Sequence, residues 1–137
     1  MKILVAVDPS DSVHLPVSRA ATMAKKEGAE LTLLAVAESV EDMESLFGAS
    51  ASERLRDKAT KALGKAQELV KAAGLSAKEL MEVGVSPEEF IVDVAKSGGF
   101  DLIVMGTRGK KGVHTLLIGS VASKVIALAP CSVLVVR

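Results

Sequence analysis

The feature of this sequence that most restricts its fold is the alternation of short apolar runs with longer amphipathic stretches. Five apolar runs are expected to form strands, and enough residues separate them for a helix between each pair. Continuous apolar runs are typical of strands that are buried on both faces of a sheet. A βαβαβαβαβ pattern folds as a parallel sheet with helices on both faces. The expected strands are residues 3–7, 31–36, 77–83, 102–105 and 132–136.

Local signals place the helices between these runs. Gly28 follows a stretch with helical periodicity and predicts a C-cap. Ser86, Pro87 and Glu89 match a capping box with proline at the first helical position. Residues 38–50 are polar, lack a clear periodicity and predict a mobile connection. The expected helices span residues 16–28, 55–74, 87–98 and 119–128.

The composition favours one domain over residues 1–137 and excludes some partners. The chain shows no composition break or internal repeat, and its length is usual for a single domain. Lys and Arg together number 17, as do Asp and Glu, so no net positive charge attracts nucleic acid or an anionic membrane. Three Phe with no Tyr or Trp leave little surface for stacking on nucleic-acid bases. We therefore expect neither nucleic acid nor a membrane as a partner.

Cysteine content and hydropathy predict a cytoplasmic protein. Cys131 is the single cysteine, so no internal disulfide can form, and we interpret it as a packing residue. No apolar run approaches the roughly 20 residues of a membrane-spanning helix. Asp8 interrupts the N-terminal apolar run too early for a secretory signal.

The predicted fold limits where a ligand can bind. In open parallel sheets, ligands bind beyond the carboxyl ends of the strands, where the strand order reverses. Residues 8–12, 36–38 and those from 106 onward occupy such positions. Asp8 is the best candidate acid, and it either caps the turn or binds ribose hydroxyls or a metal-bound water. Ser10 is interpreted as a turn residue because no base is placed to activate it as a nucleophile.

A glycine-rich segment joins the fourth expected strand to the last helix. Gly106, Gly109 and Gly119-Ser120 complete the pattern Gly-x2-Gly-x9-Gly-Ser/Thr. Glycines let the backbone approach a ligand closely, and the N–H groups and positive dipole end of a helix attract phosphate. Arg108 and the lysines after it either add charge for a phosphate or face solvent. The alternative is a glycine-rich surface turn before a helix that Ser120 caps.

Several stretches together resemble the universal stress proteins of the ATP-binding kind. They are residues 3–10 (ILVAVDPS), 101–109 (DLIVMGTRG), 119–122 (GSVA) and 130–136 (PCSVLVV), so the resemblance spans the chain. In that family, Gly-x2-Gly-x9-Gly-Ser/Thr marks the members that bind ATP. The resemblance implies a Rossmann-like α/β fold, similar to adenine nucleotide alpha hydrolases, with an open five-stranded parallel sheet of order 3-2-1-4-5. It also implies a homodimer that pairs through the last strand, 132–136.

The resemblance also implies a ligand and a site. The ligand would be ATP, or ADP or AMP, with or without Mg²⁺. The first strand and Val36 would face adenine and ribose, Met105 and Gly106 would border ribose and phosphates, and main-chain N–H groups from Gly109 onward would hold the phosphates. The residues that the resemblance assigns to the nucleotide are Ala6, Val7, Asp8, Ser10, Val36, Met105, Gly106, Arg108, Gly109, Gly119, Ser120, Val121 and Ala122.

Two positions depart from the family pattern. Pro9 stands where the family often has glycine, which stiffens the turn beside the expected ribose site. Ala122 stands where Thr or Gln is common, so one side-chain contact is lost. Neither change touches the four motif positions.

Three functions remain to be weighed. A regulatory or stress-response protein that binds ATP, with slow or no hydrolysis, fits a phosphate cradle that has no placed catalytic base. The alternative is an ATP-hydrolysing or adenylate-transferring enzyme, but residues 14–17 (HLPV) do not supply the His-x-Gly-His turn of related transferases. A phospho-accepting signalling domain would use Asp8 and Asp11, yet its acceptor aspartate is missing after the third strand. No His, Cys and carboxylate grouping has metal-ligand spacing.

Overall fold

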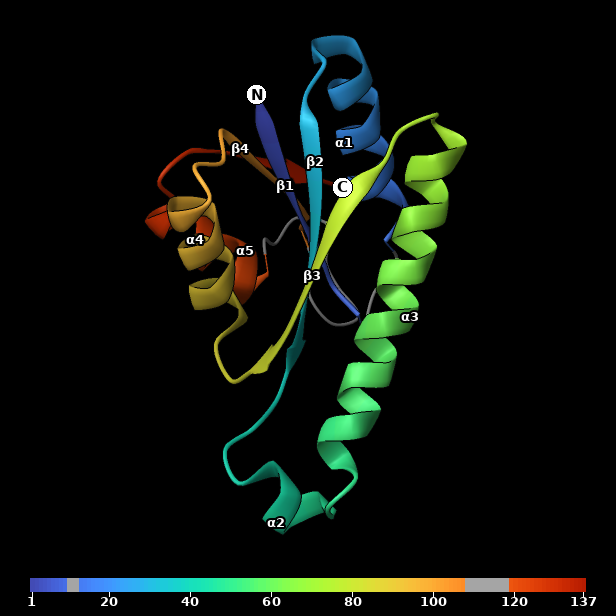
Figure 1. The fold of residues 1–137 in the computed structure, drawn as a ribbon. Helices are drawn as coiled ribbons and strands as arrows, with labels where there is room; N and C mark the ends of the chain where they lie inside the picture. The colour runs from blue at the N-terminus through green and yellow to red at the C-terminus, as the bar shows by residue number, and fades with distance from the viewer. Residues whose placement is uncertain (10–12, 108–118) are drawn as a thin grey trace.

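The chain folds around one parallel β-sheet. The computed structural model describes residues 1–9, 13–107 and 119–137. In this part of the chain, five strands pair in the order β3-β2-β1-β4-β5, which confirms the predicted fold class and strand order (Figure 1). The strands are β1 (Lys2–Val7), β2 (Glu30–Glu38), β3 (Ala77–Gly84), β4 (Leu102–Gly106) and β5 (Ser132–Val136).

Helices cover both faces of the sheet, as the right-handed crossovers of a parallel sheet require. Figure 1 shows α1 (His14–Glu27) and α3 (Ala51–Ala72) on one face, and α4 (Pro87–Ser97) and α5 (Ser120–Leu128) on the other. A short helix, α2 (Met43–Phe47), lies at the foot of α3. Among the described residues, no helix combines the length and the apolar character needed to cross a membrane.

β1 is the central strand, and its position explains its apolar sequence. Val5 lies opposite Leu33 of β2 on one side and Val104 of β4 on the other. Ile3, Leu4 and Val5 have no exposed surface. Because helices cover both faces of the sheet here, a residue of β1 is buried whichever face it points to.

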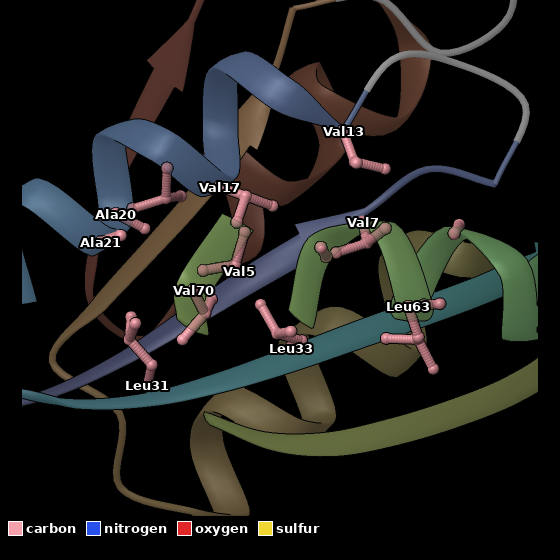
Figure 2. Packing of buried hydrophobic residues seen from close by; sticks show 14 of the residues in the cluster. Val5, Val7, Val13, Val17, Ala20, Ala21, Leu31, Leu33, Leu63 and Val70 are labelled. Carbon is pink, nitrogen blue, oxygen red and sulfur yellow. The ribbon is translucent and has the colours of Figure 1, made fainter. Parts of the chain in front are cut away.

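Two apolar cores lie on opposite faces of the sheet. Consecutive strand residues point to opposite faces, so Val5 belongs to the first core and Leu4 to the second. Figure 2 shows Val5, Val17, Leu33 and Val70 gathered between the sheet and helices α1 and α3. The largest fully buried side chains of the second core are Leu4, Leu34, Ile103 and Val125.

Two local predictions from the sequence were wrong. The side chain of Ser86 makes no capping hydrogen bond, although Pro87 does begin α4. Instead the N–H of Glu89 donates to the C=O of Ser86 at 3.0 Å, so the main chain closes the first turn. Residues 38–50 also contain a helix, α2, which was not predicted. It has only five residues, fewer than the window in which a helical periodicity can be recognised.

The remaining boundaries differ by a few residues. β2 extends to Glu38 because that residue still pairs with Gly84 of β3. α3 begins at Ala51, four residues before the apolar stripe starts at Leu55. Gly28 ends α1 with a left-handed φ of 66°, as its position after the periodic stretch predicted.

Candidate functional site

A cavity of about 580 Å³ opens at the carboxyl ends of β1, β2 and β4. The chain leaves β1 towards β2 on one side, whereas β4 lies on the other side of β1. The strand order therefore reverses beside β1, which is the position where open parallel sheets bind ligands. Small-molecule sites commonly enclose about 300–1,000 Å³, so the volume is suited to a ligand of nucleotide size. Ala6, Val7, Asp8 and Pro9 line the cavity from the end of β1 and the turn after it.

One wall of the cavity is aliphatic. Leu34 and Val36 of β2, Met105 of β4 and Ile91 of α4 contribute to it, and all four belong to the second core. They are 7 % exposed or less, so their positions are fixed by packing rather than by a ligand. Such a wall presents flat apolar surface and can cover a planar heterocycle without an aromatic side chain.

A second part of the lining is the start of α5 together with the end of β4. Gly106, Gly119, Ser120, Val121 and Ala122 form it. A helix begins with N–H groups that have no acceptor within the helix, and its dipole makes this end positive. This part of the lining therefore adds partial positive charge to a cavity whose other lining includes apolar side chains.

One of these donors is already used by the protein. The N–H of Gly119 donates to the C=O of Thr107 at 2.5 Å, and the C=O of Gly119 accepts from the N–H of Ser123 at 3.0 Å. Within the described residues, the main-chain N–H groups of Ser120, Val121 and Ala122 have no acceptor. Among the described residues of this helix start, the amides of residues 120–122 are therefore the candidate donors to a ligand.

Three charged residues also line the cavity: Asp8, Glu38 and Lys58. Lys58 comes from α3 with Leu55, which lies about one helical turn before it. The sequence predicted a helix over residues 55–74 but assigned neither residue to the site. A polar residue that borders a cavity has the same sequence pattern as one that faces solvent, so no signal marked Lys58.

Every predicted site residue that the structure describes lines this one cavity. Ser10, Arg108 and Gly109 lie outside the described residues. The residues brought together are Ala6, Val7, Asp8, Val36, Met105, Gly106, Gly119, Ser120, Val121 and Ala122. The cavity also has a boundary that the sequence analysis missed, formed by Val13, Pro16 and Val17 around the start of α1.

Other residues considered from the sequence lie elsewhere. His14 is exposed on the first turn of α1. Cys131 is half-buried against the second core, and burial together with the nearby Asp101 carboxylate raises the pKa of its thiol above the usual value. No grouping of three or more His, Cys, Asp or Glu residues suited to a metal ion occurs within residues 1–9, 13–107 and 119–137.

Comparison with known proteins identifies the family. The model of the universal stress protein family matches residues 1–137. Universal stress protein YxiE of Bacillus subtilis is 34 % identical, and the match covers 99 % of this chain and 98 % of the relative. The chain belongs to the universal stress protein family.

Solved structures of the family have the same fold. Universal stress protein UspA from Lactobacillus plantarum superimposes with a TM-score of 0.85 at 33 % identity, covering all of this chain and 97 % of that one. A universal stress protein crystallised in complex with cAMP superimposes with a TM-score of 0.74 at 26 % identity, covering 100 % and 97 % of the two chains.

Proposed function

We propose that this protein binds ATP or a related adenine nucleotide in the cavity at the carboxyl end of the sheet. The observation that carries the proposal is that one cavity is lined both by aliphatic side chains of the second core and by the start of α5. An adenine nucleotide has the same two parts, an apolar planar base and an anionic tail. The cAMP complex of a related universal stress protein supports the same class of ligand.

Each part of the nucleotide has a proposed set of partners. Adenine lies against Val36 and Met105, whose side chains are held in the second core. Asp8 accepts hydrogen bonds from the ribose hydroxyls. The phosphates bind the main-chain amides of residues 120–122, with the Ser120 hydroxyl as a further donor. Gly109 and Arg108 are proposed to complete this phosphate site.

We propose Mg²⁺ only as a cation that binds together with the nucleotide phosphates. Protein-bound Mg²⁺ usually takes one or two carboxylates together with substrate phosphates. Asp8 and Glu38 are the carboxylates in the part of the cavity lining that the structure describes. A cation bound to the phosphates would therefore lie in the same cavity as the carboxylates of Asp8 and Glu38.

We further propose a regulatory or stress-response role with slow or no hydrolysis. The described lining residues include no histidine or cysteine. The glycine-rich motif supplies phosphate-binding groups but no positioned base to activate water. Phosphate or pyrophosphate release well above background, measured with purified protein and ATP, would instead favour the ATP-hydrolysing or adenylate-transferring enzyme.

The glycines of the motif provide the direct test of ATP binding. The double variant Gly109→Val with Gly119→Val places branched side chains where the phosphates are proposed to lie. We expect no ATP binding by isothermal titration calorimetry while the wild type binds. Gly64→Val is the matched control, since a side chain at Gly64 on α3 meets nothing within 4 Å. Unchanged affinity in a folded double variant would rule out this site.

A homodimer through β5 is the proposed assembly. β5 lies at an edge of the sheet and its residues carry no charge. Residues 133–136 are only half-buried, and Ile126 and Leu128 on the preceding helix are 47 % and 59 % exposed. An uncharged edge strand beside exposed apolar side chains is a surface on which a second copy can pair.

A further inference from the structure

The segment between β2 and α3 carries an exposed apolar group of residues that the proposed function does not use. Val40, Leu46 and Phe47 are 48 %, 66 % and 59 % exposed, and the last two belong to α2. Large apolar side chains that gather on a surface mark a place where something binds. We call residues 39–50 the α2 segment.

Residues on both sides of the α2 segment line the cavity. Glu38 directly precedes the segment, and Leu55 and Lys58 follow it in the first two turns of α3. Leu55 lies four residues beyond the start of α3, about 6 Å along the helix axis. Figure 1 shows α2 beyond the carboxyl ends of the strands, the end of the sheet at which the cavity opens. α2 therefore lies on the side of the molecule at which the cavity opens.

Two side-chain hydrogen bonds at the surface join α2 to the start of α3. Arg54 donates to the Phe47 carbonyl at 3.4 Å, and Ser52 donates to the Glu44 carboxylate at 3.3 Å. Both hydrogen bonds are exposed to solvent, so breaking them costs little. A helix of only five residues also has little stability of its own.

The backbone on both sides of α2 has conformations that suit hinges. Asp42, before the helix, has a φ of 55°, and Gly48, after it, has a φ of 99°. Asp42 is the single non-glycine residue with a positive φ in the described part of the chain. Hinges are commonly a few residues at element ends that absorb a backbone rotation. The N–H of Ser39 donates to the C=O of Gly84 at 2.8 Å. This bond anchors the start of the segment to β3, so a rotation would begin after Ser39.

We propose that the α2 segment is a lid that closes over the nucleotide and places Leu46 and Phe47 against the base. This inference rests on the proposed function. The cavity is the favoured docking place because residues on both sides of the segment line it. Phe90 and Phe100 pack in or against the second core, and the chain has no Tyr or Trp. Phe47 is therefore the aromatic side chain that can stack on the base.

A fluorescence experiment tests the lid directly. Because the chain contains no Trp, Phe47→Trp introduces a single reporter. Leu80→Trp is the control, because Leu80 is 43 % exposed on β3 and does not line the cavity. ATP binding is measured separately by equilibrium dialysis. With ATP bound, we expect the Phe47→Trp emission to move to shorter wavelength and the Leu80→Trp emission to stay constant.

The outcomes separate the lid from the nucleotide site. If ATP binds by dialysis and the Phe47→Trp emission does not change, the lid is overturned and the proposed function stands. If ATP does not bind the wild type, both proposals fail. An emission that moves with protein concentration and not with ATP overturns the lid in favour of contact with a second copy.

Affinity gives a second and independent measurement. Leu46→Ser with Phe47→Ser removes apolar surface from an exposed helix without touching either core, so the variant should fold. If the lid covers the base, the loss of buried apolar area should weaken ATP binding by about tenfold. The loss should appear as faster ATP dissociation in stopped-flow experiments. Equal dissociation rates for variant and wild type would contradict closure.

Discussion

The two edge strands of the sheet, β3 and β5, have the same kind of unpaired backbone but different side chains. β3 carries Lys78, Glu79 and Glu82, all of them exposed. β5 has the sequence SVLVV, with no charged residue. Charged side chains are a common means of preventing edge-to-edge association. One edge of the sheet is thus protected by charge, whereas the other lacks this protection.

Side chains from α3 add to the protection of β3. Gln67 donates from Nε2 to the Ala77 carbonyl at 3.0 Å and to the Glu79 carboxylate at 2.6 Å. β5 has no corresponding contact from α5 among the hydrogen bonds of the described residues. The preceding helix instead exposes Ile126 and Leu128 beside that edge.

The largest expected effect is the loss of dimer affinity when proline is placed in β5. The C=O of Val136 accepts from the N–H of Thr107 at 3.2 Å, so the main-chain groups of Val136 face β4. Those of the preceding residue, Val135, then face the open edge. Val135→Pro removes an outward N–H and leaves the pairing with β4 intact. We expect the dimer dissociation constant to rise by at least about a hundredfold, measured by analytical ultracentrifugation. A Val135→Pro protein that remains dimeric would show that β5 is not the interface.

A smaller effect is expected from removing charge on β3. Lys78→Thr with Glu82→Thr keeps a β-favouring surface but takes away two exposed charges of opposite sign, so the net charge is unchanged. We expect the concentration at which larger species appear to fall by about tenfold, measured by light scattering. The same exchange at exposed Lys65 and Glu68 of α3 is the control for loss of charge alone. If the β3 variant stays as soluble as the wild type, the charges do not protect that edge.

The hydrogen bonds that Gln67 of α3 makes to β3 should contribute modestly to stability. Gln67→Ala removes the hydrogen bonds to Ala77 and Glu79. We expect the free energy of unfolding to fall by about 1 kcal/mol, measured by urea denaturation. Lys65→Ala, at an exposed position two residues earlier, should change it far less. Equal effects would mean that the Gln67 contacts carry no stability.

The smallest effect concerns Cys131, immediately before β5. Burial and the Asp101 carboxylate raise the pKa of its thiol, so less thiolate is present at a given pH than in the unfolded chain. Alkylation of the folded protein by iodoacetamide should be a few-fold slower than that of the urea-unfolded chain, and its pH midpoint should be higher. A pH midpoint of alkylation below that of the unfolded chain would show that the pKa of the Cys131 thiol is not raised.

Most of the fold could be predicted because β1 and β4 are continuous apolar runs with one consistent interpretation. The parallel strands follow from these runs and from the crossovers between them, whereas the strand order was implied by the resemblance to the universal stress proteins. α2 could not be predicted in this way, because five residues are too few for a helical periodicity to stand out from the polar sequence around them. The capping box at Ser86 failed for another reason, since main-chain bonding closes that turn without the side chain.

The candidate site was predictable where it consists of backbone and glycine. Gly106, Gly119 and Ser120 could be located because their spacing forms a motif, and the structure places them in one cavity wall. Lys58 and Leu55 reach the same cavity from a helix about 50 residues before that motif. Their contribution depends on how α3 packs across the sheet, which no local pattern encodes.

The position of β1 has a consequence for the synthesis of the protein. The N–H of Lys2 donates to the carboxylate of Asp101, 99 residues further along the chain. While the ribosome is still making the chain, β1 can join β2 and β3, but its other side stays unpaired until β4 emerges. The cavity is completed later still, when α5 docks. A molecule that binds there distinguishes finished chains from partial ones, and by mass action it holds them in the finished state.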